Sequence, residues 1–309
     1  MKMRYCLLIG SVLGSLLAGT ADVRADSGDL PKGAQKRVDD AYRRRNFTFS
    51  DFGRDYGEFK NYLNREYGFD YSFDVSYMPQ RGAPNGRKTA YQTLISPSFT
   101  WTAFNNEYGT GTLNFAYTVA RYGGSQAARI GGNIGAVTEI NDYDDKSNAF
   151  NELYYSYQAG GSWKWLTVAA GQFPLSNFDG TAYDSNQQVN FINYALSQNA
   201  SSTYSTAGVG AYLQATPNSE WTFAVGAQDA TNVDGISMRF NNLNEEHYAT
   251  FGYIAYSPTI KGLGAGQYSV LLYNQPWVEE QKQTTNGWSV NLSQAIGDKL
   301  TVFGRVNGV

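Results

Sequence analysis

The stretch YGFDYSFDVSY, from Tyr67 to Tyr77, constrains the fold of this chain more than any other part of the sequence. Its odd-numbered positions are all aromatic or aliphatic, whereas its even-numbered positions are Gly, Asp or Ser. Because successive side chains of a strand point to opposite faces, this pattern predicts one apolar and one polar face. Such a run exceeds the usual length of a soluble strand and matches the roughly 9 to 11 residues that a tilted strand needs to cross a bilayer.

The N-terminus has the layout of a secretory signal peptide. Two basic residues precede an apolar run from Cys6 to Ala18, and Ala25 ends an A-x-A-like cleavage site. A retained anchor helix is disfavoured because this run is well short of the ~20 residues that span a bilayer. We therefore predict that residues 1–25 are a signal peptide and that the mature chain is exported.

Composition narrows the class of protein further. With 33 Gly, 24 Tyr, a mean hydropathy of −0.44 and no later apolar run of transmembrane length, the sequence excludes a helical membrane protein and fits a barrel with a polar interior. The formal net charge of −3 argues against nucleic acid as a partner. Because Cys6 and His247 are the only residues of their kinds, we expect no disulfide, metal site or cofactor.

The same alternation recurs along the chain and predicts eleven antiparallel strands. In the strand near 150–158, Leu153 is expected to face lipid. In the strand near 247–257, Phe251 and Tyr253 are expected to face lipid as well. Pro97 falls on the apolar parity and lacks an N–H, so we expect it at a bulge or near a strand end. The predicted strands are 67–77, 95–103, 113–119, 150–158, 165–172, 206–215, 220–228, 247–257, 266–274, 286–295 and 299–307.

The connections between these strands alternate in length. The long ones are 78–92, 123–149, 173–205, 229–246 and 275–285, and the short ones are 105–111, 159–164, 216–219, 258–265 and 297–298. Since bacterial outer-membrane barrels have short periplasmic turns and long external loops, the first strand is expected to rise from the periplasm. Residues 26–66 would then form a periplasmic segment. Apolar residues at helical spacing predict a short helix over about 54–66, which either tucks into the barrel mouth or forms a cap.

Several segments make the chain resemble the carbohydrate-selective porins of the OprB type. Besides the helix-then-strand segment at 62–77, they are FNELYYSYQ at 150–158, GQFPLSNFDGTAY through FINYAL at 171–196, AVGAQDATNVDG at 224–235 and GWSVNLSQAIGDKLTVFGRVNG at 287–308. The resemblance covers most of the mature chain. It implies an all-β fold, a sixteen-stranded transmembrane antiparallel β-barrel in the outer membrane of a Gram-negative bacterium, which passes mono- and disaccharides.

The end of the sequence departs from this pattern. It stops at Gly308-Val309 after an odd number of predicted strands, without the terminal aromatic residue common in outer-membrane barrels. A first and a last strand left as open edges are not tolerated in hydrocarbon. We therefore expect residues 67–309 to be a C-terminally incomplete barrel domain, with about eleven strands of a sixteen-stranded parent, and the predicted function is that of the parent.

The selectivity of a water-filled pore depends on inward side chains at its narrowest level. By parity, the inward candidates are Asp70 and Asp74 on the first strand, Glu152 and Tyr154 on the fourth, and Arg305 on the last. For each charged residue, a solvated wall position without a selective role stays open as the alternative.

The connection 173–205 is a second source of pore-lining residues. It contains six aromatic residues and is uncharged apart from Asp179 and Asp184. Folding inward against the wall would bury these aromatic rings and form a constriction, although they could also pack on one another in an external loop. The candidates in this connection are Asn177, Asp179, Tyr183 and Asn186.

The predicted function is passive diffusion of carbohydrates through an outer-membrane porin. A general or ion-selective porin and a barrel with adhesive or structural loops are the alternatives. No enzymatic activity is expected, because His247 has no identifiable nucleophile as partner. The acidic cluster at 142–145 lacks the Gly and distal Glu of an EF-hand loop, so no metal site is assigned there. The expected partners are small sugars, outer-membrane lipid and the barrel-assembly machinery, and a homo-oligomer stays open.

Overall fold

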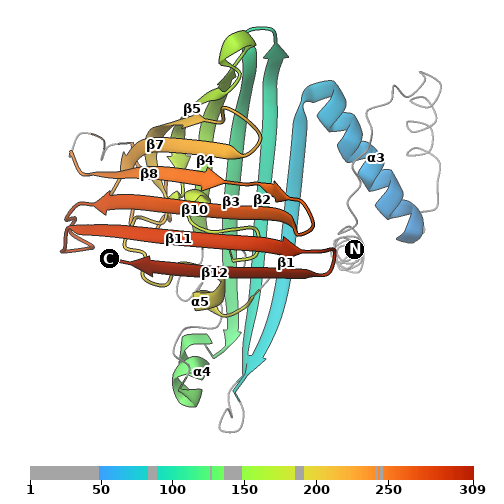
Figure 1. Cartoon of the computed structure of the whole chain (residues 1–309). Helices are drawn as coiled ribbons and strands as arrows, with labels where there is room; N and C mark the ends of the chain where they lie inside the picture. Colours follow the sequence, from blue (N-terminus) through green and yellow to red (C-terminus); the bar gives the residue numbers. More distant parts are fainter. Residues whose placement is uncertain are drawn as a thin grey trace.

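The computed structural model describes residues 49–82, 89–125, 127–135, 148–184, 191–240, 243 and 246–309. These residues form one large antiparallel sheet (Figure 1). Its strands are β1 (Phe69–Arg81), β2 (Thr89–Asn106), β3 (Gly109–Gly124), β4 (Asn148–Ala159), β5 (Leu166–Phe173), β6 (Gly208–Ala215), β7 (Trp221–Asp229), β8 (Tyr248–Tyr256), β9 (Thr259–Ile260), β10 (Gly264–Gln275), β11 (Thr285–Ile296) and β12 (Leu300–Gly308).

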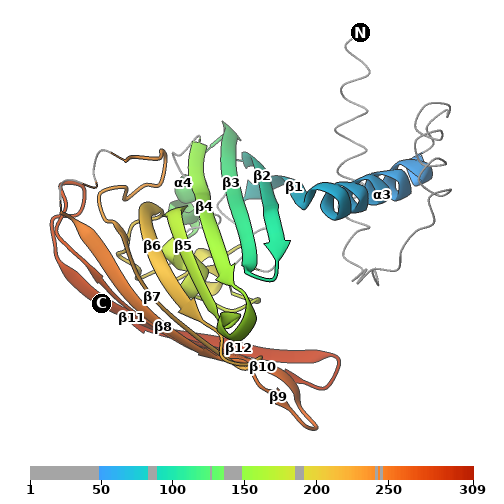
Figure 2. The same ribbon diagram turned by 90° about the horizontal axis from the view of Figure 1, so that it is seen from above.

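Each strand of the sheet pairs with its neighbours in sequence, in the order β1-β2-β3-β4-β5-β6-β7-β8-β10-β11-β12, and β9 pairs with β10 alone. The eleven strands of this path correspond to the eleven predicted ones, which confirms the predicted antiparallel all-β arrangement. The sheet curves, and one of its faces is concave (Figure 2). Among the described residues, β1 and β12 each have one neighbour, so the sheet has two edges.

The convex face carries the apolar side chains that lipid contact requires. Residues at the predicted outward positions of β6, β7, β10 and β12 have 48 to 63% of their surface exposed. They are Leu213, Val225, Leu272, Val302 and Val306. The concave face carries polar pairs between neighbouring strands, such as Thr100 Oγ1 donating to Asn114 Oδ1 (3.2 Å) and Asn151 Nδ2 donating to Thr118 Oγ1 (2.7 Å).

The prediction that Phe251 and Tyr253 face lipid is wrong. The register places Gly252 of β8 opposite Leu272, an outward residue of β10, so Phe251 and Tyr253 have the inward parity. Phe251 is buried against Phe178, with 4.7 Å between their ring centroids. Because β8 has large apolar residues on both parities, alternation alone does not select its lipid face.

Pro97 lies in the middle of β2 and pairs with Phe73 of β1. On the other side of β2, the ladder to β3 passes from Ile95 opposite Val119 directly to Ser98 opposite Ala116. The gap falls where Pro97 has no N–H to donate. The register is the same on both sides of the gap, and Pro97 lies in the middle of the strand, so the prediction of a bulge or a strand end at Pro97 is wrong.

Helix α3 (Phe49–Tyr67) precedes β1 and is longer than the predicted 54–66. Gly68 follows the last helical residue and donates its N–H to the carbonyl of Asn64. Its φ of 64° lies in the left-handed region, which glycine adopts readily at the end of a helix. The helix is held to β1 by an ion pair of 3.2 Å between Lys60 and Asp70. The predicted signal peptide and residues up to 48 lie outside the described residues.

The remaining helices are short and lie in connections. They are α4 (Ala127–Ile134), α5 (Tyr194–Ser197) and the 3₁₀ turns η1 (Gly161–Trp163) and η2 (Leu175–Phe178). None of the helices in the described part of the chain combines the length and apolar character needed to cross a membrane.

Candidate functional site

The connection between β5 and β6 lies against the concave face of the sheet (Figure 2). We call its described residues, 174–184 and 191–205, the inner segment. It starts with η2, whose Leu175 and Phe178 are buried in an apolar cluster with Phe173, Phe251 and Tyr273 of the wall. Apolar burial therefore holds the start of the inner segment against the inside of the sheet.

An ion cluster holds the inner segment to β12. Arg305 of β12 has 7% of its side chain exposed, and its Nη2 lies 3.2 Å from Oδ2 of Asp184. Its Nε lies 3.9 Å from Oδ1 of Asp179, and Nη2 also donates to the carbonyls of both aspartates. Nε further donates to Asn291 of β11 at 2.7 Å. One guanidinium thus joins two wall strands and two loop residues.

The Asp179 carboxylate is buried and fully engaged within the fold. Its Oδ2 accepts from Asn199 Nδ2 (2.8 Å) and from the Tyr204 hydroxyl (2.9 Å), both in the second half of the inner segment. Its Oδ1 accepts from Asn291 Nδ2 at 3.2 Å. Because burying a charge is costly unless it is paired and hydrogen-bonded, these contacts mark a structural anchor.

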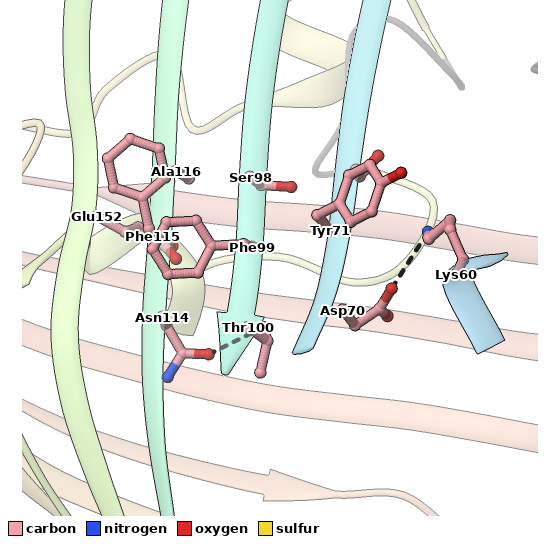
Figure 3. Close-up of a pocket in the computed structure, with 11 residues that line it drawn as sticks. Lys60, Asp70, Tyr71, Ser98, Phe99, Thr100, Asn114, Phe115, Ala116 and Glu152 are labelled. Atoms are coloured by element: carbon pink, nitrogen blue, oxygen red, sulfur yellow. Dashed lines mark hydrogen bonds and ion pairs between the residues drawn. The ribbon is translucent and has the colours of Figure 1, made fainter. Parts of the chain in front are cut away.

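The inner segment also contacts the opposite wall. Asn177 Nδ2 donates to Glu152 of β4 at 2.8 Å. Glu152 lines an open pocket of about 270 Å³ with Lys60 and Asp70 at its other end (Figure 3). Tyr154, the next inward residue of β4, packs its ring 6.3 Å from that of Tyr212. The inner segment therefore bridges β4 and β12 across the concave face.

Aromatic rings of the inner segment lie on β12. Tyr183 stacks on Phe303, with 6.1 Å between the ring centroids, and Phe191 lies 5.2 Å from the same ring. The Tyr183 hydroxyl accepts from Thr301 Oγ1 at 3.2 Å. Tyr183 and Phe191 stay 38 and 39% exposed, so part of each ring is available to a solute.

The predicted site residues separate into groups. The structure brings together Arg305, Asp179 and Tyr183 at β12, and places Asn177 with Glu152 at β4. Asp70 binds Lys60, and Asp74 accepts from Ser72 Oγ at 3.1 Å; both lie apart from the ion cluster. Asn186 lies outside the described residues.

Sequence reasoning missed four members of the ion cluster. They are Asp184, Asn199, Tyr204 and Asn291. Asp184 could have been predicted as a site residue, because it is one of only two charged residues in the whole connection. Among the described residues, no group of three His, Cys, Asp or Glu side chains could hold a metal ion, and the acidic cluster at 142–145 lies outside them.

No protein-family model matches the sequence. The chain is 39% identical over 257 residues to "Porin AaxA" of Chlamydia abortus and 40% identical over 255 residues to "Porin AaxA" of Chlamydia felis. Each match covers 80% of this chain and 57% of the relative, so the chain spans little more than half the length of these relatives.

A solved structure of Pseudomonas putida OprB superimposes with a TM-score of 0.59, covering 82% of this chain and 70% of that one. The sequence identity of that match is 13%. At such low identity, the likeness shows a shared fold.

Proposed function

We propose that the full-length parent of this chain forms a water-filled channel for passive diffusion of carbohydrates. The chain has the fold of the OprB-like outer-membrane porins, and its relatives are named as porins. The proposed solutes are mono- and disaccharides. They would cross along the concave face of the sheet, past the inner segment and the inward residues Asp74, Glu152 and Tyr154.

One observation carries the proposal: the inner segment hides its charges and leaves neutral groups exposed. Asp179 and Asp184 are buried with Arg305, whereas Asn177 is exposed and the Tyr183 and Phe191 rings are partly so. Neutral sugars are held by hydrogen-bonding groups and by flat aromatic faces, not by net charge. Such a lining suits a sugar better than an anion or a cation.

A second candidate function is a general porin that prefers cations. It is favoured by Asp74 and Glu152, whose carboxylates have the inward parity on β1 and β4. Acidic side chains lining a pore attract cations and repel anions. In this reading, the inner segment would narrow the pore without recognising a sugar.

The proposal also names the partners of the parent protein and includes no catalytic activity. Outer-membrane lipid would cover the apolar convex face, and the barrel-assembly machinery would insert the parent protein. A homo-oligomer is compatible with this arrangement. We assign no catalytic step, and solutes would move down their gradients.

Single-channel recording of the purified full-length parent in a planar bilayer tests the proposal. Maltose or glucose added to the salt solution should interrupt the current in a concentration-dependent manner. The reversal potential in a KCl gradient separates the two candidates: sugar block favours the carbohydrate channel, and a cation-selective potential without block favours the general porin. A complete lack of conductance would refute both and favour the adhesive or structural alternative.

A further inference from the structure

We infer that Arg305 is a positioning residue, which holds the inner segment as a fixed constriction and does not itself contact the solute. This inference rests on the proposed channel function. It gives Arg305 a different role from the pore-lining one expected from sequence parity. The inward parity of Arg305 is as predicted, but the inner segment covers its side chain.

The surroundings of the Arg305 guanidinium support an anchoring role. Its donors go to Asn291 of the neighbouring strand and to the carbonyls of Asp179 and Asp184, and both carboxylates lie close to it. An arginine that selects solutes must present donors to the water in the pore. With 7% of its side chain exposed, Arg305 is turned toward the protein.

The second half of the inner segment depends on the same anchor. Asn199 and Tyr204 both bind the Asp179 carboxylate, which itself lies beside Arg305. Further along, Thr203 Oγ1 lies 2.7 Å from Thr285 Oγ1 of β11. Losing the guanidinium would leave two buried carboxylates without their shared counter-charge and loosen both halves of the segment.

The contacts at β4 and β12 argue for a constriction that stays in place. Asn177 binds Glu152 on one side of the concave face, while Asp179 and Asp184 bind Arg305 on the other. A segment held to both walls through residues 177–184 cannot swing away from β12 without breaking the buried ion cluster. The size of the open pore would therefore be set by this cluster.

The first experiment is polymer exclusion in single-channel recordings of the full-length parent. Poly(ethylene glycol) of increasing size lowers the conductance until the polymer no longer enters the pore. Arg305→Ala should raise the conductance and the size of the largest polymer that enters. Asp184→Ala removes the loop side of the ion pair and should act in the same direction, which keeps the test usable if Arg305→Ala does not fold. Arg121→Ala, which removes an exposed arginine of outward parity from β3, is the matched control and should behave as the unmodified protein.

A second measurement reports on the inner segment without using conductance. Ser197 of α5 is fully buried, and residues 26–309, which follow the predicted signal peptide, hold no cysteine, so Ser197→Cys introduces one buried thiol into this part of the chain. A water-soluble maleimide should modify this thiol slowly in an otherwise unmodified chain. Combination with Arg305→Ala should increase the modification rate at least about tenfold, because local opening exposes the thiol.

The outcomes separate this inference from the proposed function. If the unmodified parent does not conduct, the channel proposal fails, while the maleimide rate still tests the anchoring role. If the parent conducts but Arg305→Ala and Asp184→Ala leave both the polymer limit and the maleimide rate unchanged, the anchoring role is refuted and the channel stands. A lost sugar block at an unchanged polymer limit would instead assign Arg305 to solute binding.

Discussion

The guanidinium of Arg305 on β12 lies 3.2 Å from the carboxylate of Asp184, although the two residues are 121 positions apart in the sequence. Both side chains are almost completely buried. Removing one partner of a buried ion pair is costly, because the other charge stays buried without compensation. Here the pair fixes the inner segment against the last two strands of the sheet.

Asp179 and Asp70 should differ strongly in their effect on stability. Asp179→Ala removes a buried carboxylate that accepts from Asn199, Tyr204 and Asn291, and should lower the free energy of unfolding by about 3 kcal/mol. Asp70→Ala removes a largely exposed partner of Lys60 and should cost less than about 1 kcal/mol. Urea unfolding of the parent protein in lipid vesicles measures both values, and equal costs would contradict the assignment of Asp179 as an anchor.

The packing of η2 against the wall predicts a second contrast, between two phenylalanines of the inner segment. Phe178→Ala should destabilise the protein by about 3 to 5 kcal/mol, because the ring is buried against Phe251, Tyr253 and Tyr212. Phe191→Ala loses a partly exposed ring that contacts Phe303 and should cost about 1 kcal/mol. The same unfolding assay distinguishes them, and a small cost at Phe178 would show that the inner segment is not packed as described.

A side chain at Gly287 should destabilise the protein. A Cβ at this position would lie 2.0 Å from Cζ of the Tyr273 ring, whose hydroxyl accepts from the Thr203 N–H of the inner segment. Gly287→Ala should therefore cost about 1 to 3 kcal/mol, the usual range for overpacking. Gly304→Ala on β12 is the control, because a Cβ there meets no atom within 4 Å and should be nearly neutral. Comparable destabilisation of both variants in the unfolding assay would argue against the Tyr273 packing.

Neighbouring residues of β1 should differ in their access to water. Asp74→Cys should react with a water-soluble thiol reagent in the parent protein, since Asp74 has the inward parity, whereas Phe73→Cys should be shielded by lipid. The extent of modification by a charged maleimide, measured by mass spectrometry in intact vesicles, gives the result. A reactive cysteine at Phe73 together with an unreactive one at Asp74 would reverse the register of this strand.

The sequence by itself determined the strands and their order. Side-chain alternation is a local property with a period of two, so it is readable wherever one face meets lipid and the other meets polar groups. It therefore predicted the eleven strands and the outward parity of Leu213, Val225 and Val302. It failed at β8, where Phe251 has the inward parity and is covered by Phe178, a residue from a distant connection.

Only the tertiary structure decided what the charged residues do. Parity placed Arg305 on the inner face, but it could not show that Asp179 and Asp184 would lie over it and remove it from the water. That arrangement depends on the path of a segment that meets β4, β11 and β12 at once. Contacts between residues more than a hundred positions apart leave no periodic trace in a single sequence, because each is set by where the curved sheet brings its strands together.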